Sequence, residues 1–140
     1  MVILTCDHGG FYDMEKLMKY FDKYKIEYKY MGPKEFNKED DYPDFTIPAC
    51  KEVLKNEDNV GIFMCGSGIG VNMVANRFKG IRAVCAYDPV VAFFARKDED
   101  ANVLTLGSRM TSFRSMIKII KMFLTSEFEG GRHARRIAKY

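Results

Sequence analysis

The stretch of residues 60–71, VGIFMCGSGIGV, limits the possible folds of this chain more than any other. A short apolar run ends at Cys65 and is followed by alternating glycines at positions 66, 68 and 70. Such a run, closed by glycines, is typical of a buried strand that turns sharply into a helix. The glycines leave backbone N–H groups uncovered near the start of that helix, where they suit an anion and favour a thiolate at Cys65. A tight structural turn with a buried structural cysteine is the alternative interpretation.

Short apolar runs alternate with segments of helical periodicity along the whole chain. The expected strands are residues 2–4, 26–30, 60–65, 81–86 and 102–106. The expected helices are residues 13–24, 44–55, 71–78, 89–96 and 112–125, with a short basic helix in the tail after Gly130-Gly131. This alternation predicts an α/β fold, namely a single-domain, three-layer αβα structure with a Rossmann-like five-stranded parallel sheet and a C-terminal tail helix. Ligands of such sheets bind beyond the carboxyl ends of the strands, so the site is expected among the turns at 5–10, 65–70, 87–88 and 107–109.

Composition narrows the possible functions and the number of domains. The chain has 140 residues, of which 47% are hydrophobic and 29% charged, and this predicts one domain over residues 1–140. A net charge of +3 is too small to indicate nucleic-acid or membrane binding, and no apolar run is long enough to span a membrane. The N-terminus lacks the basic start of a signal peptide. The four cysteines form no C-x-x-C pair, so we expect free thiols and a cytoplasmic location.

The sequence gives no sign of a bound cofactor or metal. The glycine motif is G-x-G-x-G after the third expected strand, whereas dinucleotide binding requires G-x-G-x-x-G after the first, and the G-K-[ST] ending of a Walker loop is absent. His8 and His133 are the only histidines, and neither has a second ligand at metal spacing. Taken alone, Asp7-His8 is as compatible with a local turn as with a functional site.

The basic tail allows two interpretations. On a helix, Arg132 and Arg136 lie four residues apart on one face, where two guanidinium groups can clamp a phosphate. A solvated basic helix end that complements the helix dipole is the alternative, and residue spacing alone favours it.

Seven segments occur in a characteristic order along the chain. They are CDHGG at 6–10, DYPD at 41–44, CGSGIG at 65–70, GIRAV at 80–84, ANVL at 101–104, LGSR at 106–109 and FEGGRH at 128–133. With these segments the chain resembles the ribose-5-phosphate isomerase B family, which also includes galactose-6-phosphate and allose-6-phosphate isomerases. The resemblance spans nearly the whole chain, from the first expected strand to the tail.

The resemblance implies a cofactor-independent aldose–ketose isomerase that interconverts ribose 5-phosphate and ribulose 5-phosphate through an enediolate, as in the pentose phosphate pathway. It implies that Cys65 is the base, because position 71, which is glutamate in some relatives, is valine here. Such a reaction also needs donors for the developing oxyanion. In the family these donors come from the backbone of the loop that corresponds to Gly66, Ser67, Gly68, Ile69 and Gly70.

The resemblance also implies a set of substrate-binding residues and a partner subunit. Asp7 matches a residue that binds sugar hydroxyls, and His8 matches one that lies near the phosphate. The family's phosphate-binding arginines correspond to Arg109, Arg132 and Arg136. In relatives the tail reaches across a dimer, so we expect either a homodimer or a tetramer formed by two such dimers, in which residues 127–140 contact the partner.

One segment departs from the family pattern. The family usually carries His-Asn-Asp before the ANVL strand, and its histidine opens the sugar ring, whereas this chain reads Lys97-Asp98-Glu99-Asp100. Asp98 therefore stands at the position of the ring-opening histidine, and Glu99 at that of an asparagine that touches the substrate. A carboxylate can also shuttle a proton, particularly where burial raises its pKa. Otherwise a different group such as His8 opens the ring, or the substrate arrives already open.

Two other functions stay open at this point. The first is an isomerase for another phosphosugar, such as allose or galactose 6-phosphate. The second is a sugar-phosphate-binding module without catalysis, which the changed segment at 97–100 would suit and the retained Cys65 disfavours.

Overall fold

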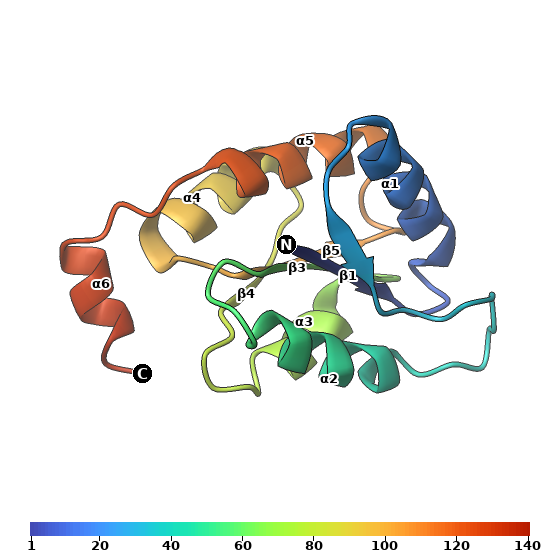
Figure 1. The fold of residues 1–140 in the computed structure, drawn as a ribbon, viewed down its shortest axis with the longest axis horizontal. Coiled ribbons are helices and arrows are strands. Elements are labelled where there is room, and N and C mark those ends of the chain that lie inside the picture. Colours follow the sequence, from blue (N-terminus) through green and yellow to red (C-terminus); the bar gives the residue numbers. More distant parts are fainter.

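A five-stranded, all-parallel sheet with the order β2-β1-β3-β5-β4 forms the centre of the protein (Figure 1). The computed structural model describes residues 1–140. The strands are β1 (Val2–Cys6), β2 (Tyr28–Tyr30), β3 (Val60–Cys65), β4 (Ala83–Cys85) and β5 (Val103–Gly107). The helices are α1 (Phe11–Lys23), α2 (Tyr42–Val53), α3 (Ile69–Ala75), α4 (Pro89–Glu99), α5 (Phe113–Thr125) and α6 (Arg132–Ile137). The predicted α/β class with a parallel sheet and a tail helix is confirmed.

Helices cover both faces of the sheet, giving the expected three layers. Helices α1, α4 and α5 lie on one face and α2 and α3 on the other (Figure 1). The strands β1 and β5 are buried along their whole length, as their near-continuous apolar sequences predict for parallel strands covered on both faces. Phe21, Met116 and Phe123 fill the core on the first face, and Phe63 and Val71 belong to the core on the second.

The helix starts follow from local capping chemistry. The Asp88 carboxylate accepts hydrogen bonds from the backbone N–H groups of Val90 and Val91, and Pro89 occupies the first turn of α4. Helix α3 begins at residue 69, two residues earlier than predicted, because Gly68 in front of it adopts a left-handed conformation with φ of 80°. Only glycine tolerates this conformation without strain.

The switch point of the sheet lies between β1 and β3. Strand β1 pairs with β2 on one side and with β3 on the other, so the connections leaving this region run in opposite directions. A crevice therefore opens beyond the carboxyl ends of these two strands, which is where ligands bind in sheets of this kind.

The tail stands apart from the sheet. Helix α6 lies at one end of the molecule, beyond the end of α4 (Figure 1). Gly130 and Gly131, which precede it, have positive φ angles of 71° and 58°, and the backbone N–H of Glu129 bonds to the Lys97 carbonyl at 2.9 Å. None of the helices combines the length and the apolar character needed to cross a membrane.

Candidate active site

A cavity of about 360 Å³ lies at the carboxyl edge of the sheet, at the switch point. Its size is within the range of small-molecule sites. It is lined by Asp7, His8, Gly9, Tyr42, Cys65, Gly66, Ser67, Gly70, Arg109 and Met110. The turns after β1, β3 and β5 thus bring together most of the predicted site residues.

Cys65 is the last residue of β3 and lines this cavity, although it is only 5% exposed. Its Sγ accepts a hydrogen bond from the backbone N–H of Gly68 at 3.1 Å. The sulfur therefore has both a hydrogen-bond donor beside it and access to a ligand.

The glycine loop is held against its neighbours at very short range. A methyl group added at Gly107 would lie 2.4 Å from the Ser67 carbonyl, and one added at Gly9 would lie 2.6 Å from the Gly66 nitrogen. The Thr105 hydroxyl donates to the Gly68 carbonyl at 2.9 Å. This packing fixes the loop that carries Cys65.

Some backbone N–H groups of the loop at residues 66–70 already donate hydrogen bonds within the protein. Gly68 donates to the Cys65 sulfur, and Ile69 donates to the Ser67 hydroxyl at 3.2 Å. Neither Gly68 nor Ile69 lines the cavity, whereas Gly66, Ser67 and Gly70 do. Of the five loop positions predicted to donate to an oxyanion, these three are therefore the ones that lie where a ligand can reach them.

Arg109 is the basic side chain of the cavity. Its backbone N–H bonds to the Gly66 carbonyl at 2.9 Å, and its guanidinium covers Gly66 so closely that an added methyl there would meet it at 3.1 Å. The guanidinium has no carboxylate partner and is exposed, so it is available to a phosphate.

Asp7 and His8 lie side by side at the end of β1, with a third charged residue, Asp40, behind His8. Asp7 Oδ1 accepts the Gly9 N–H at 2.8 Å, and burial raises the pKa of Asp7 against the opposing effect of His8. His8 Nδ1 lies 2.6 Å from Asp40 Oδ1, which also accepts the His8 backbone N–H at 2.9 Å. This hydrogen bond raises the pKa of His8 above 6.5, and burial opposes it.

Two other cysteines are structural. Cys6 and Cys50 are buried, and burial raises the pKa of each thiol to about 12. Neither of them lines the cavity, and the half-buried Cys85 does not line it either, so Cys65 is the thiol placed for chemistry.

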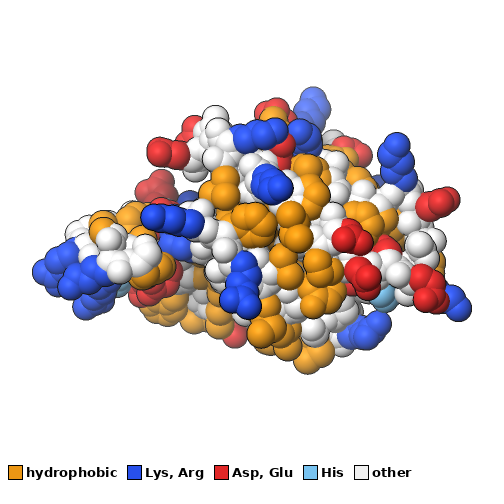
Figure 2. Space-filling model, turned by 90° about the horizontal axis from the view of Figure 1, so that it is seen from below, with side chains coloured by type: hydrophobic (Ala, Val, Ile, Leu, Met, Phe, Trp, Pro, Cys, Tyr) orange, Lys and Arg blue, Asp and Glu red, His pale blue; other side chains and the backbone are white.

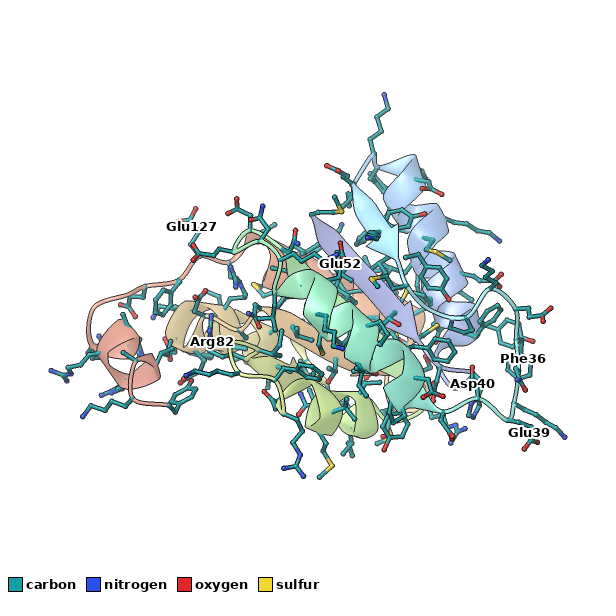
Figure 3. All side chains as sticks on the ribbon, turned by 60° about the horizontal axis from the view of Figure 1, so that its bottom comes forward. Phe36, Glu39, Asp40, Glu52, Arg82 and Glu127 are labelled. Atoms are coloured by element: carbon teal, nitrogen blue, oxygen red, sulfur yellow. The ribbon has the colours of Figure 1, made fainter.

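Sequence reasoning missed Asp40, Tyr42 and Met110 as site residues. Tyr42 belongs to the DYPD segment, which was the available signal, and its ring lies so close to Gly70 that an added methyl would meet it at 2.7 Å. Asp40 comes from the long loop between β2 and α2 (Figure 3). No pattern in that charged loop indicates which of its acidic residues turns inward.

Gly68 and Ile69 belong to the loop beside the cavity without lining it, and four other predicted site residues lie away from it. Asp98 and Glu99 end α4 at the amino edge of the sheet, and Arg132 and Arg136 are exposed on α6. Figures 1 and 3 show α6 and the loop that carries Asp40 at opposite ends of the molecule. Within one chain these four residues cannot join Cys65, and their predicted roles require a second subunit.

Asp98 is part of a separate polar cluster. His133 Nε2 lies 3.5 Å from Asp98 Oδ1 and 3.3 Å from Glu129 Oε2, and Lys97 Nζ lies 3.2 Å from the same Glu129 oxygen. His133 is buried here, and the cluster holds the tail against the end of α4.

Two groups have ligand atoms close enough to share a metal ion, namely Asp7, His8 and Asp40, and Asp98, Glu129 and His133. In the first, the ring nitrogen nearest the carboxylates is already bonded to Asp40 at 2.6 Å. In the second, the ammonium group of Lys97 lies 3.2 Å from Glu129 Oε2 and 3.9 Å from Asp98 Oδ1, so a cationic group already faces both carboxylates.

A parallel sheet covered by helices on both faces, with a polar cavity at its switch point, defines an α/β protein with a small-molecule site. In this protein the site contains a thiol and an arginine. Comparison with known proteins makes this more specific. The family model described as "Ribose/Galactose Isomerase" matches residues 2–140. The chain belongs to this family.

Individual relatives match over almost the full length. Ribose-5-phosphate isomerase B of Escherichia coli is 33% identical, with 97% of this chain and 91% of that protein covered. The crystal structure of ribose-5-phosphate isomerase B from Mycoplasma genitalium with bound ribulose-5-phosphate is 39% identical and superposes with a TM-score of 0.94, covering 99% of this chain and 91% of that one. A structure of ribose-5-phosphate isomerase B from Clostridium thermocellum is 34% identical, with a TM-score of 0.94 and coverage of 99% and 93%.

Proposed function

We propose that this protein is a cofactor-independent isomerase that interconverts ribose 5-phosphate and ribulose 5-phosphate. The observation that carries the proposal is Cys65 in a small polar cavity beside Asp7 and Arg109, in a chain that resembles a ribulose-5-phosphate-bound structure over its whole length. The four free cysteines suit a reducing compartment such as the cytoplasm.

In the proposed mechanism, the Cys65 thiolate removes a proton from the carbon next to the carbonyl and returns it to the neighbouring carbon. The negative charge that develops on the enediolate oxygens is stabilised by backbone N–H groups at Gly66, Ser67 and Gly70. Arg109 holds the phosphate and Asp7 binds sugar hydroxyls. Burial, which raises the pKa of Asp7, also strengthens its hydrogen bonds to those hydroxyls.

A homodimer would complete the site, because the partner would supply Asp98, Glu99, Arg132 and Arg136. Exposed apolar side chains support association, and on α3 and α4 these are Ile69, Met73, Val90, Val91 and Phe94. Beside them lies a largely apolar cavity of about 620 Å³ that Tyr140 of the tail also lines. Figure 2 shows apolar side chains over the middle of one face and Lys and Arg gathered on α6. We propose that residues 127–140 contact the partner.

The variant Cys65→Ala tests the role of Cys65 as the base. We expect isomerisation of ribose 5-phosphate to fall at least about 100-fold, because the proton acceptor is lost. Cys50→Ala is the matched control, since Cys50 is also buried but lies on α2 outside the cavity. Equal activity of wild type and Cys65→Ala would overturn the mechanism.

The substrate is tested by comparing kcat/KM for ribose, allose and galactose phosphates in one assay. The proposal requires the five-carbon substrate to be preferred. Preference for a six-carbon phosphosugar would assign the protein to another branch of the family. Tight binding of phosphosugars without exchange of the substrate proton would instead indicate a binding module.

A further inference from the structure

His8 lines the cavity and makes a short contact with Asp40 behind it, and the proposed proton transfer by Cys65 does not use this pair. Asp40 Oδ1 lies 2.6 Å from His8 Nδ1 and accepts the His8 backbone N–H at 2.9 Å. The Asp40 side chain is 8% exposed and that of His8 29%. The carboxylate is thus placed behind the ring, and the ring remains open to the cavity.

This arrangement determines which ring nitrogen can react. A carboxylate only accepts hydrogen bonds, so Nδ1 carries a proton and donates a hydrogen bond to Asp40. Nε2 has no hydrogen-bond partner in the protein. It is therefore a base when the ring is neutral and an acid when the ring is charged.

Aromatic contacts of Phe36 also hold the loop that carries Asp40 in place. Phe36 of the same loop stacks on Tyr12 with ring centroids 5.4 Å apart and meets the His8 ring edge-on at 6.5 Å. Figure 3 shows Phe36 and Asp40 on this loop. Aromatic packing and the ion pair together restrict the His8 ring to one orientation.

We propose that His8, oriented by Asp40, is the acid–base residue that opens the sugar ring. This inference rests on the proposed function. His8 is the catalytic residue and Asp40 is its positioning residue. Only two histidines are present in the chain, and His133 is buried between Asp98 and Glu129 at the far end of α4, so His8 is the imidazole that the cavity contains.

The step balances with groups of the cavity. The imidazolium Nε2–H protonates the ring oxygen while the bond from that oxygen to C1 breaks. The Asp7 carboxylate takes the proton of the C1 hydroxyl, which becomes the aldehyde carbonyl. The sugar gains one proton and loses one, and water returns the proton from Asp7 to His8. The open-chain aldehyde is then the substrate for Cys65.

The charge around His8 suits an acid. Hydrogen bonding to Asp40 raises the pKa of His8, as does the charge of Asp7, so more of the ring is protonated near neutral pH than for a free histidine. The other titratable or charged groups that line the cavity are Tyr42, Cys65 and Arg109.

The test separates ring opening from proton transfer at carbon. Ribulose 5-phosphate has no furanose ring to open, so exchange of its C1 hydrogen in D₂O requires Cys65 but no ring step. We expect Asp40→Asn to lower isomerisation of ribose 5-phosphate about tenfold or more, with C1 exchange unchanged within about twofold. Glu39→Gln is the matched control, because it removes the same charge from the neighbouring, exposed residue of the same loop (Figure 3).

A second readout does not depend on activity. With only two histidines, ¹H NMR titration resolves both rings, and Asp40→Asn should lower the pKa of His8 while leaving that of His133 in place. An unchanged His8 titration, or an equal fall of isomerisation and C1 exchange, would overturn the proposal. If the wild type neither isomerises nor exchanges, the proposed function itself fails, an outcome distinct from any effect confined to Asp40→Asn.

Discussion

At the residue scale, the Asp40–His8 pair makes stability depend on pH. The folded-state pKa of His8 is raised above 6.5 by its hydrogen bond to Asp40, whereas the unfolded chain keeps a value of about 6.5. The stabilisation by this pair is therefore complete below about pH 6.5 and is lost as pH rises through the raised pKa. We expect Asp40→Asn to lower Tm more at pH 6 than at pH 9, as measured by circular dichroism. A Tm difference independent of pH would contradict this, and Glu39→Gln provides the baseline.

The sequence predicts site residues where they directly follow a strand. The turns that contain Asp7, Cys65 and Arg109 were predicted because the carboxyl ends of parallel strands share one edge of the sheet, and the family resemblance then indicated these residues within them. Asp40 and Tyr42 were not predicted, because Asp40 lies in the loop at residues 31–41 and Tyr42 directly after it, and the path of this loop depends on aromatic packing across the fold. Local sequence carries no information about a contact between positions 8 and 40.

At the scale of elements, the site depends on how closely the glycine loop packs on β5. A methyl group at residue 107 would lie 2.4 Å from the Ser67 backbone, which cannot yield without moving the loop. We expect Gly107→Ala to lower the free energy of unfolding by about 1–3 kcal/mol and to reduce activity further by displacing Cys65. Chemical denaturation and steady-state kinetics measure the two effects.

The neighbouring Ser108→Ala is the control for this prediction. Its hydroxyl is buried without a hydrogen-bond partner, so its removal should leave stability unchanged or slightly increased. Wild-type stability in Gly107→Ala would show that the loop has room to move.

Every predicted strand and helix is present, but several ends differ by two or more residues. The apolar runs were sufficient to identify the elements, because parallel strands buried on both faces leave a strong pattern. The ends depend on backbone geometry instead. Helix α3 starts early because Gly68 turns left-handed, and β4 is shorter than predicted, with Ala83–Cys85 paired to β5.

At the scale of the whole molecule, one chain presents the predicted site in two separate parts. The cavity with Cys65 lies at the carboxyl edge of the sheet, and the exposed Arg132 and Arg136 lie on α6 at the far end (Figure 1). Sequence order cannot show this separation, because spacing along a chain gives no distance across the fold. If both parts act on one phosphosugar, as the family resemblance implies, each site must combine two subunits.

Mixed dimers test this requirement directly. Cys65→Ala subunits and Arg132→Ala/Arg136→Ala subunits should each be inactive, because every site then lacks one necessary group. A heterodimer of the two has one site with both defects and one with neither. Co-expression with different tags should therefore restore about a quarter of the wild-type activity in the mixture and half in the purified heterodimer, provided that dimers form at random.

Pairing Cys65→Ala with Asp7→Asn is the control. Both residues belong to the same part of the site, so neither site of that heterodimer is intact and activity should stay absent. Activity of Arg132→Ala/Arg136→Ala alone, or no recovery in the first heterodimer, would show that the tail does not complete a neighbouring site.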